Sequence, residues 1–458
     1  MSALWTSADA EAATLGRVTR AFDVAGLSID TRTLKPGDLY VALKGDTRDG
    51  HDFVKAAFAA KAAAALVSRK PDGVAEEPLL MVANTLRGLE DMARASRARS
   101  HAKIIAVTGS AGKTTTKEML RLAFGALGQT HASAASYNNH WGVPLSIASM
   151  PHDAQFGIFE IGMNHFGEIR PLVGFARPHV ALITTIAPAH LEFFGTCEAI
   201  ADAKSEIFEG IVPGGAALIP ADNDYADRLR ARAKQAGISR ILSFGEKAGS
   251  DARLISTTEA ETGMKIDAQI LGRPLSFRIG APGAHIASNA MGALLAVAAV
   301  DGDLLNAAAA LSSFSALKGR GARFRISVGD GSADVIDESY NANPASMTAA
   351  LALLGSAQGR RIAVLGDMLE MGPDGPAHHA ALARDIEAAR VDLVFANGAQ
   401  MKSLWDVLPA SRRGAYGEKS CDIAPALMAA LRVGDVILVK GSLGSRMAVI
   451  IDALKARG

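Results

Sequence analysis

The residues best suited to chemistry lie at positions 102–120, AKIIAVTGSAGKTTTKEML. An apolar, β-branched run leads into a short loop with two glycines and then into a helix-like segment, which is the strand–loop–helix order of a phosphate-binding loop. Gly109 and Gly112 let backbone N–H groups approach phosphates, and Lys113 supplies a positive charge beside them. Thr114 offers a hydroxyl to Mg²⁺. We therefore expect the chain to bind a nucleoside triphosphate.

One position departs from the usual phosphate-loop pattern. That pattern has its first glycine five residues before the Gly-Lys pair, and Val107 holds this place here. A glycine-rich turn with a chance lysine is the alternative interpretation. The order of strand, turn and helix around the loop disfavours it.

Three further residues follow or end apolar runs that resemble strands. Glu160 lies in FGIFEIG, His190 ends ALITTIAPAH, and Lys204 lies in ADAKSEIFEG. Ligands of an open α/β sheet bind beyond the carboxyl ends of its strands, so we expect Glu160 and His190 to reach the phosphates. Glu160 suits Mg²⁺ as an oxygen ligand, whereas a histidine is a less usual ligand, and the spacing alone favours His190 as a hydrogen-bonded core residue. Lys204 on its own is most simply a surface lysine.

Polar residues elsewhere are candidates for substrate binding. Asn138 and Asn139 open the loop NNHWGVP and are able to hold polar ligand groups. Asn289 lies in an apolar helix and requires a hydrogen-bond partner, either a core group or the edge of an adenine. The loops around Arg32 and Lys44 form either a pocket for an anionic ligand or ordinary turns rich in glycine and aspartate.

Composition argues against several classes of protein. The chain has 48 Lys and Arg against 47 Asp and Glu, so its charge gives no reason to expect a nucleic-acid or membrane partner. Its two cysteines, Cys197 and Cys421, lack metal-ligand spacing and fit a reducing cytoplasm. The N-terminus has no signal-peptide pattern. The longest apolar stretch, 284–300, is interrupted by polar residues and predicts a buried helix and no membrane span.

The length of 458 residues suggests three α/β domains, which we expect at 1–84, 85–315 and 316–458. The first is a small α/β unit with a helix near 53–64. An arginine-rich helix at 84–102, expected to present a solvated face, leads into the second. There, strands alternate with helices and predict a mainly parallel sheet, followed by an antiparallel pair at 264–279. The third domain alternates again as a doubly wound, Rossmann-like unit.

These motifs together resemble the Mur ligases, ATP-dependent amide ligases of cell-wall precursor synthesis. The resemblance rests on TGSAGKTTT at 108–116, the Asn-Asn loop at 138–139, Glu160-Ile-Gly, and single residues that match the family, and it covers all three domains. The displaced first glycine is normal in that family. The matching single residues are His190, Lys204 and Asn289.

Within the family, the chain is most similar to members that join D-alanyl-D-alanine to UDP-N-acetylmuramoyl-tripeptide. The stretches that carry this likeness are DTR at 30–32, PGDLYVAL at 36–43, GHDF at 50–53, EIGMNHFGEI at 160–169, IAPAHLEFFGT at 186–196, DESYNANPASM at 337–347, GDMLEMG at 366–372 and KGSLGSRM at 440–447. The chain departs from the family pattern at Thr31, where serine is frequent, and at Glu338, where aspartate is frequent. Threonine keeps the hydroxyl of serine, and glutamate keeps the charge of aspartate.

The resemblance also implies roles for individual residues. Lys113, Glu160, His190 and a carbamylated Lys204 would be catalytic, and the last three would bind Mg²⁺ together with Thr114. ATP would be held by the loop residues Thr108, Gly109, Ser110, Ala111, Gly112, Lys113, Thr114 and Thr115, and by Asn289, Arg320 and Asp337. The UDP end would be held by Thr31, Arg32, Lys44, Asn138 and Asn139. Asn341, Asn343, Lys440 and Arg446 would line the side where the dipeptide enters.

The family implies two steps. ATP would activate the tripeptide carboxylate as an acyl phosphate, and the amine of D-alanyl-D-alanine would then attack it. We expect ATP and Mg²⁺ as cofactors, a cytoplasmic monomer, and closure of the third domain about a hinge at 315–318. Two alternatives remain. A sister ligase of the folylpolyglutamate type lacks the N-terminal DTR and GHDF motifs. A nucleotide-dependent switch is disfavoured as a GTPase because the chain has no Asn-Lys-x-Asp motif.

Overall fold

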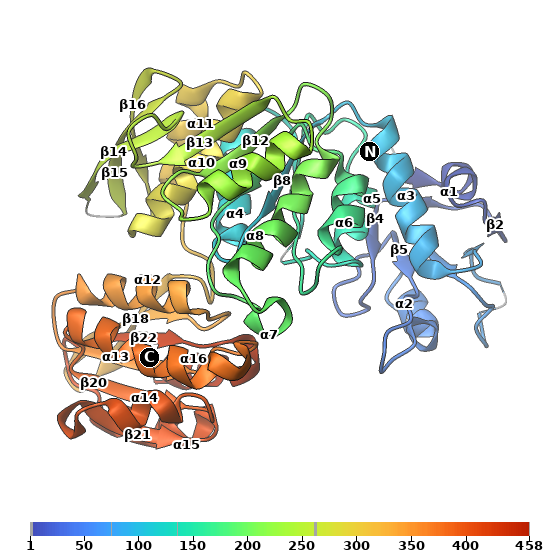
Figure 1. Ribbon diagram of the computed structural model, residues 1–458. Coiled ribbons are helices and arrows are strands. Elements are labelled where there is room, and N and C mark those ends of the chain that lie inside the picture. Colours follow the sequence, from blue (N-terminus) through green and yellow to red (C-terminus); the bar gives the residue numbers. More distant parts are fainter. Residues whose placement is uncertain (1–2, 75, 135, 261–262, 458) are drawn as a thin grey trace.

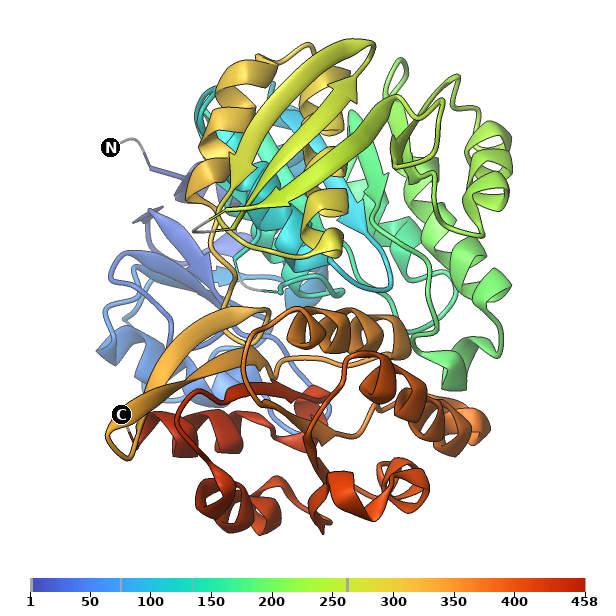
Figure 2. The same cartoon turned by 90° about the vertical axis from the view of Figure 1, so that its left-hand side faces the viewer.

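The three expected α/β domains are present in the computed structural model, which describes residues 3–74, 76–134, 136–260 and 263–457. The N-terminal domain (blue) and the C-terminal domain (orange to red) contact different sides of the central domain (Figure 1). In the view turned by 90°, the C-terminal domain lies beneath the central one (Figure 2). The predicted fold class is confirmed.

The N-terminal domain is built on a five-stranded sheet, which is parallel except at one edge. Its order is β2 (Arg17–Val18), β7 (Leu79–Met81), β6 (Ala64–Val67), β5 (Asp38–Val41) and β4 (Gly26–Ser28), with only the β2–β7 pair antiparallel. Helix α2 (Val54–Ala59) is shorter than the helix expected at 53–64. The two-residue strands β1 (Trp5–Thr6) and β3 (Asp23–Val24) pair beside helix α1 (Ser7–Thr14).

A nine-stranded sheet forms the central domain. From one edge to the other it contains β16 (Arg273–Ile279), β15 (Met264–Ile270), β14 (Ala252–Glu259), β13 (Arg240–Gly245), β12 (Ala216–Pro220), β11 (Val180–Ile183), β8 (Lys103–Thr108), β10 (Phe156–Glu160) and β9 (Thr130–Ala132). The strands from β9 to β14 are parallel, and β14, β15 and β16 pair antiparallel. The antiparallel pair predicted at 264–279 is therefore confirmed, and β14 adds a strand that the sequence did not predict.

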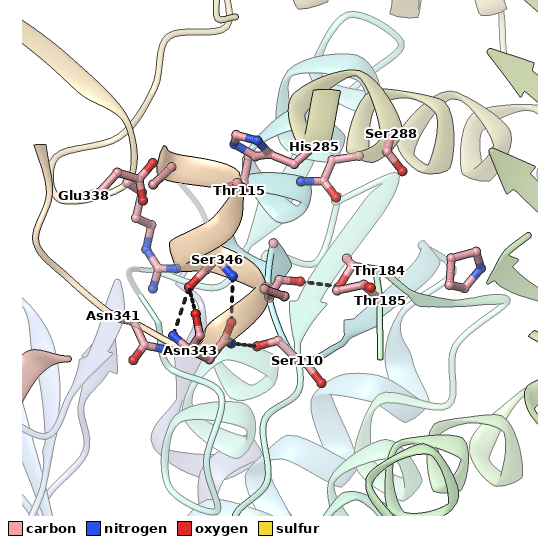
Figure 3. A pocket seen from close by; sticks show the side chains of 18 of the residues that line it. Ser110, Thr115, Thr184, Thr185, His285, Ser288, Glu338, Asn341, Asn343 and Ser346 are labelled. Atoms are coloured by element: carbon pink, nitrogen blue, oxygen red, sulfur yellow. Dashed lines mark hydrogen bonds between the residues drawn. The ribbon is translucent and has the colours of Figure 1, made fainter. Parts of the chain in front are cut away.

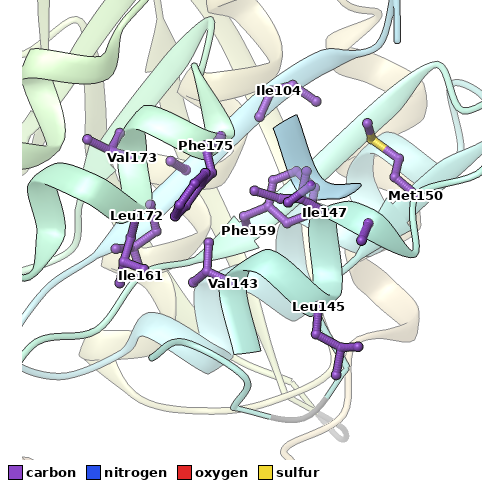
Figure 4. Packing of buried hydrophobic residues seen from close by; sticks show 14 of the residues in the cluster. Ile104, Val143, Leu145, Ile147, Met150, Phe159, Ile161, Leu172, Val173 and Phe175 are labelled. Carbon is purple, nitrogen blue, oxygen red and sulfur yellow. The ribbon is translucent and has the colours of Figure 1, made fainter. Parts of the chain in front are cut away.

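Helices cover both faces of this sheet. One face carries α4 (Lys113–Gly125), α10 (Ala284–Ala299) and α11 (Leu304–Ala310). Helix α10 is buried along almost its whole length, as its apolar sequence predicts. The other face carries α5 (Gly142–Ala148) and α6 (Ile169–Ala176), and between these helices and the sheet lie Ile104, Phe159 and their neighbours (Figure 4). Helices α8 (Cys197–Ser205) and α9 (Ala226–Gln235) extend this layer.

The helix that joins the first two domains corrects one expectation. It is α3 (Thr85–Arg99), and its arginines do not form a uniformly solvated face. Arg97 is buried, and its guanidinium donates to the carbonyl oxygens of Ala176 at 2.7 Å and Arg177 at 2.9 Å. Because these carbonyls lie at the C-terminal end of α6, a cation there compensates both their unpaired lone pairs and the helix dipole.

A six-stranded sheet forms the C-terminal domain. Its order is β17 (Ala322–Val328), β18 (Gly331–Glu338), β22 (Val436–Lys440), β19 (Arg361–Gly366), β20 (Leu393–Asn397) and β21 (Arg413–Gly417), and only the β17–β18 pair is antiparallel. The helices are α12 (Pro344–Gly355), α13 (Gly375–Ala388), α14 (Lys402–Val407), α15 (Ser420–Ala430) and α16 (Ala448–Lys455). Helix α12 lies on the side that faces the central domain (Figure 1). No helix in the described part of the chain is long and apolar enough to cross a membrane.

Candidate active site

The phosphate loop connects β8 to α4, as predicted. Gly112 has a φ of 80° and caps α4, a conformation that favours glycine. Gly109 lies so close to β11 that a Cβ there would come within 1.8 Å of the Thr184 hydroxyl. That hydroxyl donates to the Ala111 carbonyl oxygen at 2.5 Å, and the Ser110 N–H donates to the Thr185 carbonyl oxygen at 2.9 Å. The loop is thus held against the residues that follow β11.

Lys113 lies at the first position of α4 and turns back over the loop. Its Nζ donates to the Gly109 carbonyl oxygen at 2.7 Å. Burial lowers the pKa of Lys113, and the nearby Arg320 guanidinium lowers it further, while the Glu160 carboxylate acts in the opposite direction. Lys113 also begins α4, a thirteen-residue helix, and the dipole of this helix favours a bound anion at its N-terminus.

Glu160 ends β10 and is almost fully buried beside the phosphate loop. One of its oxygens accepts the Thr114 hydroxyl at 2.8 Å, and the other accepts the Asn138 amide at 2.7 Å. The parallel pairing of β8 and β10 places Glu160 opposite Val107, and so brings these groups to the same sheet edge. Thr114 and Glu160, both expected at the metal, are therefore adjacent, and Asn138, expected on the UDP side, contacts the same carboxylate.

His190 and Lys204 lie on the segment after β11. His190 immediately precedes α7 (Leu191–Phe194), and its Nδ1 pairs with the carboxylate of Glu370 from the C-terminal domain. This hydrogen bond lowers the pKa of Glu370. Lys204 in α8 is buried and has no hydrogen-bond or ion-pair partner among the described residues, and burial holds its pKa well below the ordinary value, with the Lys113 charge adding to the effect. In the described ranges, no three His, Cys, Asp or Glu side chains gather as a metal site.

A cavity of about 350 Å³ opens beside the phosphate loop, between the central and C-terminal domains. Figure 3 shows Thr115 near His285, with Ser288 farther along α10, while Asn343 and Ser346 at the N-terminus of α12 lie next to Ser110. Asn289 also lines the cavity, and its amide lies 3.0 Å from the position of a Cβ on Gly112.

The cavity is closed on its far side by residues after the domain linker. Arg320 lines it, donates to the Ser136 hydroxyl at 3.1 Å and stacks 4.2 Å from the ring centre of Tyr340. Lys440 also lines this cavity, where its Nζ donates to Glu338 at 3.1 Å and to the Asn341 carbonyl oxygen at 3.0 Å. The structure thus brings Lys440, expected on the dipeptide side, to the larger cavity.

Asp337, expected beside the nucleotide, is not among the residues that line this cavity. It is buried, and its carboxylate accepts the Gly319 N–H at 3.0 Å and the Ser339 N–H and hydroxyl at 3.1 and 2.6 Å. The neighbouring Glu338 lines the cavity instead. Asp337 therefore fixes the turn around Gly319, next to Arg320.

A second cavity of about 150 Å³ lies on the other side of Ser110 and is lined by Asn341, Asn343, His190 and Glu370 among others. Asn343 caps α12 and also donates to the Ser110 carbonyl oxygen at 3.2 Å. Arg446, the fourth residue expected on the dipeptide side, is exposed and lines neither cavity.

The residues expected to bind a UDP group lie across the boundary between the first two domains. Arg32 is exposed, and its guanidinium pairs with the Asp30 carboxylate. Thr31 lies beside it, half-buried. The loop after Lys44 lies close to the 136–141 segment: a Cβ on Gly45 would be 3.0 Å from the Trp141 ring.

Asn139 differs from its neighbour Asn138. Its side-chain oxygen accepts the Gly142 N–H at 2.9 Å and the Trp141 N–H at 3.2 Å, so this amide fixes the turn into α5.

Two residues were not singled out from the sequence. Thr184 supports the phosphate loop, and Glu370 pairs with His190. Glu370 lies inside the GDMLEMG stretch, which carried part of the family likeness. The sequence of this stretch does not indicate that Glu370 contacts His190. Thr184 is one of two adjacent threonines after β11. A hydroxyl at the end of a strand is the one sequence feature that points to its role beside the phosphate loop.

Comparison with known proteins gives three matching family models. They are "Mur ligase family, catalytic domain" over residues 23–103, "Mur ligase middle domain" over 107–297, and "Mur ligase, glutamate ligase domain" over 322–443. A UDP-N-acetylmuramoyl-tripeptide--D-alanyl-D-alanine ligase of Rickettsia prowazekii is 32% identical over 98% of this chain and 99% of its own length. The ligase of that name from Escherichia coli is 34% identical over 94% of each chain. The crystal structure of MurF from Acinetobacter baumannii covers 99% of both chains with a TM-score of 0.86 and 30% identity.

Proposed function

The chain belongs to the Mur ligase family, and from this premise we propose that it joins D-alanyl-D-alanine to the peptide carboxylate of UDP-N-acetylmuramoyl-tripeptide, a step of peptidoglycan precursor synthesis. ATP is consumed and ADP and phosphate are released. The likeness to ligases of that name over nearly the whole chain supports this substrate pair. The single observation that carries the chemistry is the phosphate loop, which lines the cavity between two domains and whose Thr114 contacts Glu160.

In the first step, an oxygen of the tripeptide carboxylate attacks the γ-phosphorus of ATP. The bond to the bridging oxygen breaks, ADP leaves, and an acyl phosphate remains. The loop N–H groups and Lys113 are the donors for the β- and γ-phosphates, because they lie at the N-terminus of α4. Lys113 now contacts the Gly109 carbonyl oxygen and exchanges this neutral acceptor for phosphate oxygens. Asn289 and Arg320 face the same cavity from α10 and the linker, where the nucleoside lies.

The residues present fit magnesium, although its direct ligands remain part of the proposal. Glu160 and Thr114 offer hard oxygens, and the 2.8 Å hydrogen bond between them supports a single ion bound by both. Magnesium held there would neutralise charge on the phosphate oxygens. His190 would contribute Nε2, because Glu370 engages its Nδ1.

Lys204 fits the implied carbamate better than it fits an ammonium group. The ammonium form would be buried without an acidic partner in the described residues and close to the charge of Lys113. Its lowered pKa favours the neutral amine, which is the form that adds to CO₂. The resulting carbamate is an anionic oxygen ligand, so the burial of Lys204 supports this modification.

In the second step, the amine of D-alanyl-D-alanine attacks the acyl carbon. The carbon–oxygen bond to phosphate breaks, phosphate leaves with the electron pair, and the new amide loses one proton to solvent. We place the dipeptide in the smaller cavity, where Asn341 and Asn343 lie beside Ser110 of the phosphate loop. The UDP end lies toward Arg32, Lys44 and the Asn138 loop.

The remaining assignments belong to the same proposal. The domains extend over 1–84, 85–315 and 316–458 and carry the UDP substrate, ATP and the dipeptide side, respectively. The enzyme acts as a monomer in the cytoplasm, where ATP and UDP-linked precursors are available, and its third domain closes by rotation about 315–318.

The test is phosphate release with Mg-ATP, UDP-N-acetylmuramoyl-tripeptide and D-alanyl-D-alanine, with each component omitted in turn. Release only in the complete mixture is expected, together with a product heavier by the dipeptide minus water. Release with the nucleotide alone would indicate a plain ATPase. If D-alanyl-D-alanine is inert but glutamate and a folate are accepted, the chain is a sister ligase.

A further inference from the structure

The loop at 366–372, GDMLEMG, is held firmly within the C-terminal domain. The Met368 N–H donates to Nε2 of the buried His379 at 2.9 Å, and the Leu369 N–H donates to the Ser442 hydroxyl at 3.0 Å. Met368 and Met371 anchor the loop in the core beneath it. A loop fixed at these points presents the intervening Glu370 in a defined position.

Glu370 points out of its own domain and onto the start of α7 in the central domain. Its carboxylate accepts from Nδ1 of His190, and its carbonyl oxygen accepts the Glu192 N–H at 3.2 Å. Gly372 has a φ of 66°, and a Cβ at this position would lie 3.3 Å from the Glu192 Cα, so the close approach favours glycine. Leu191 packs against the hydrophobic cores of both domains.

The two paired residues share an uncommon backbone conformation. His190 has a φ of 57° and Glu370 a φ of 61°, and neither is glycine. Left-handed conformations of such residues persist only where the surroundings hold them, and they gather at functional sites. Here the surroundings are each other's segments, on opposite sides of a domain boundary.

We propose that Glu370 is a positioning residue that holds the His190 ring in one tautomer and one orientation when the C-terminal domain contacts the central domain. With Nδ1 donating to the carboxylate, Nε2 remains as the acceptor. His190 lines the smaller cavity together with Ser110 and Asn343, so an oriented ring presents its free nitrogen beside the phosphate loop. The pair thereby couples domain contact to completion of the site.

This inference rests on the proposed function, since the ring is oriented for the acyl-transfer site. It is tested with Glu370→Ala, which removes the acceptor, and Glu370→Gln, which keeps an oxygen acceptor without the charge. The matched control is Glu387→Gln, on the exposed face of α13 in the same domain. Thermal unfolding confirms that each variant is folded. If Glu370→Ala does not fold, the positioning role is tested with Glu370→Gln alone.

Two readouts are compared. For Glu370→Ala we expect a fall in kcat of about 10–100-fold, with the KM for the UDP substrate changing much less, and for Glu370→Gln a smaller fall. The second readout is nitrogen-15 NMR of histidine-labelled protein, with His190→Gln assigning the signal. The wild type should show His190 protonated at Nδ1, Glu370→Ala should lose this preference, and the Glu387→Gln control should keep it.

The outcomes separate the two ideas. A Glu370→Ala variant with wild-type kcat and an unchanged His190 tautomer overturns the positioning role. An inactive wild type in the complete substrate mixture overturns the proposed ligase function instead. In that case the NMR comparison alone decides whether Glu370 sets the ring.

Discussion

The Asn343 side chain donates from Nδ2 to the Ser110 carbonyl oxygen at 3.2 Å, and so joins the N-terminus of α12 to the phosphate loop of another domain. The same amide accepts the Ser346 N–H through Oδ1 at 2.9 Å and caps its own helix. One buried side chain thus serves helix stability with its oxygen and domain contact with its nitrogen. The two roles are separable because an aspartate keeps only the first.

Substitution of Asn343 should separate stability from catalysis. Asn343→Asp keeps the helix cap but places an acceptor against the Ser110 carbonyl, so we expect near-wild-type stability and a fall in kcat of about tenfold. Asn343→Ala loses both contacts and should also lose about 1 kcal/mol of unfolding free energy. Urea unfolding and steady-state kinetics measure the two effects. Wild-type kcat in Asn343→Asp would show that the 3.2 Å contact is dispensable.

The contact between Gly109 and Thr184 can be tested with two alanine variants. In Gly109→Ala the new methyl would lie 1.8 Å from the Thr184 hydroxyl, which must then move away from the Ala111 carbonyl. We expect a loss of about 1–3 kcal/mol in stability and about 100-fold in kcat. The control is Gly125→Ala at the exposed end of α4, where a Cβ meets nothing within 4 Å. It should raise stability by about 0.4–1 kcal/mol, measured by urea unfolding.

If Lys204 carries a carbamate, a carboxylate added to the solution should partly replace that anion in a variant that lacks the lysine. Lys204→Ala leaves space beside a buried site, and we expect kcat to fall by about 100-fold and to recover in part when short carboxylates are added. Lys204→Met fills that space, so the same carboxylates should not rescue it. The measurement is phosphate release as a function of added acetate or propionate. Equal behaviour of the two variants would argue against an anionic group at this position.

His179 should make stability depend on pH. Burial, together with the charges of Lys103 and Arg97, lowers its pKa to about 4, and its Nδ1 accepts the Ile104 N–H at 3.0 Å. The unfolded chain, with a pKa near 6.5, binds the proton more readily, so unfolding free energy should fall as pH decreases from about 6.5 to 4. We expect the His179 contribution to be about 1–2 kcal/mol, because the ring is only half-buried.

His179→Asn tests this assignment because its side-chain oxygen can replace Nδ1 as the acceptor without titrating. Its urea-unfolding curve should depend less on pH over this window than the wild-type curve. His101→Asn, at an exposed position, is the control and should retain the wild-type dependence. A His179→Asn profile parallel to the wild type would refute the assignment.

Local patterns predicted the groups that lie close to the phosphate loop. Lys113 and Thr114 follow from one motif, and Glu160 from the rule that ligands gather at strand ends. The pair of His190 and Glu370 could not be predicted in this way, because 180 residues separate them and neither motif indicates its partner. The place of Lys440 in the larger cavity could not be predicted for the same reason, since it depends on Glu338 of the neighbouring strand.

The strands that are hardest to predict from the sequence lie toward sheet edges. β17 and β21 are the edge strands of their sheet, and β14 leads the antiparallel extension of the other. Their exposed residues make the apolar signal weak: β17 alternates with arginines, and most of β14 faces solvent. The central strands, buried on both faces, gave continuous apolar runs and were found.

The distribution of the hydrophobic cores has a consequence for how the molecule loses its structure. One core joins Leu39 of the N-terminal sheet to Ile104 and Ile219 of the central sheet, whereas the C-terminal domain has two cores of its own. Cooperativity extends as far as apolar packing is shared. The three domains should therefore melt as two units, and a protease that opens the C-terminal unit should leave the other two domains intact.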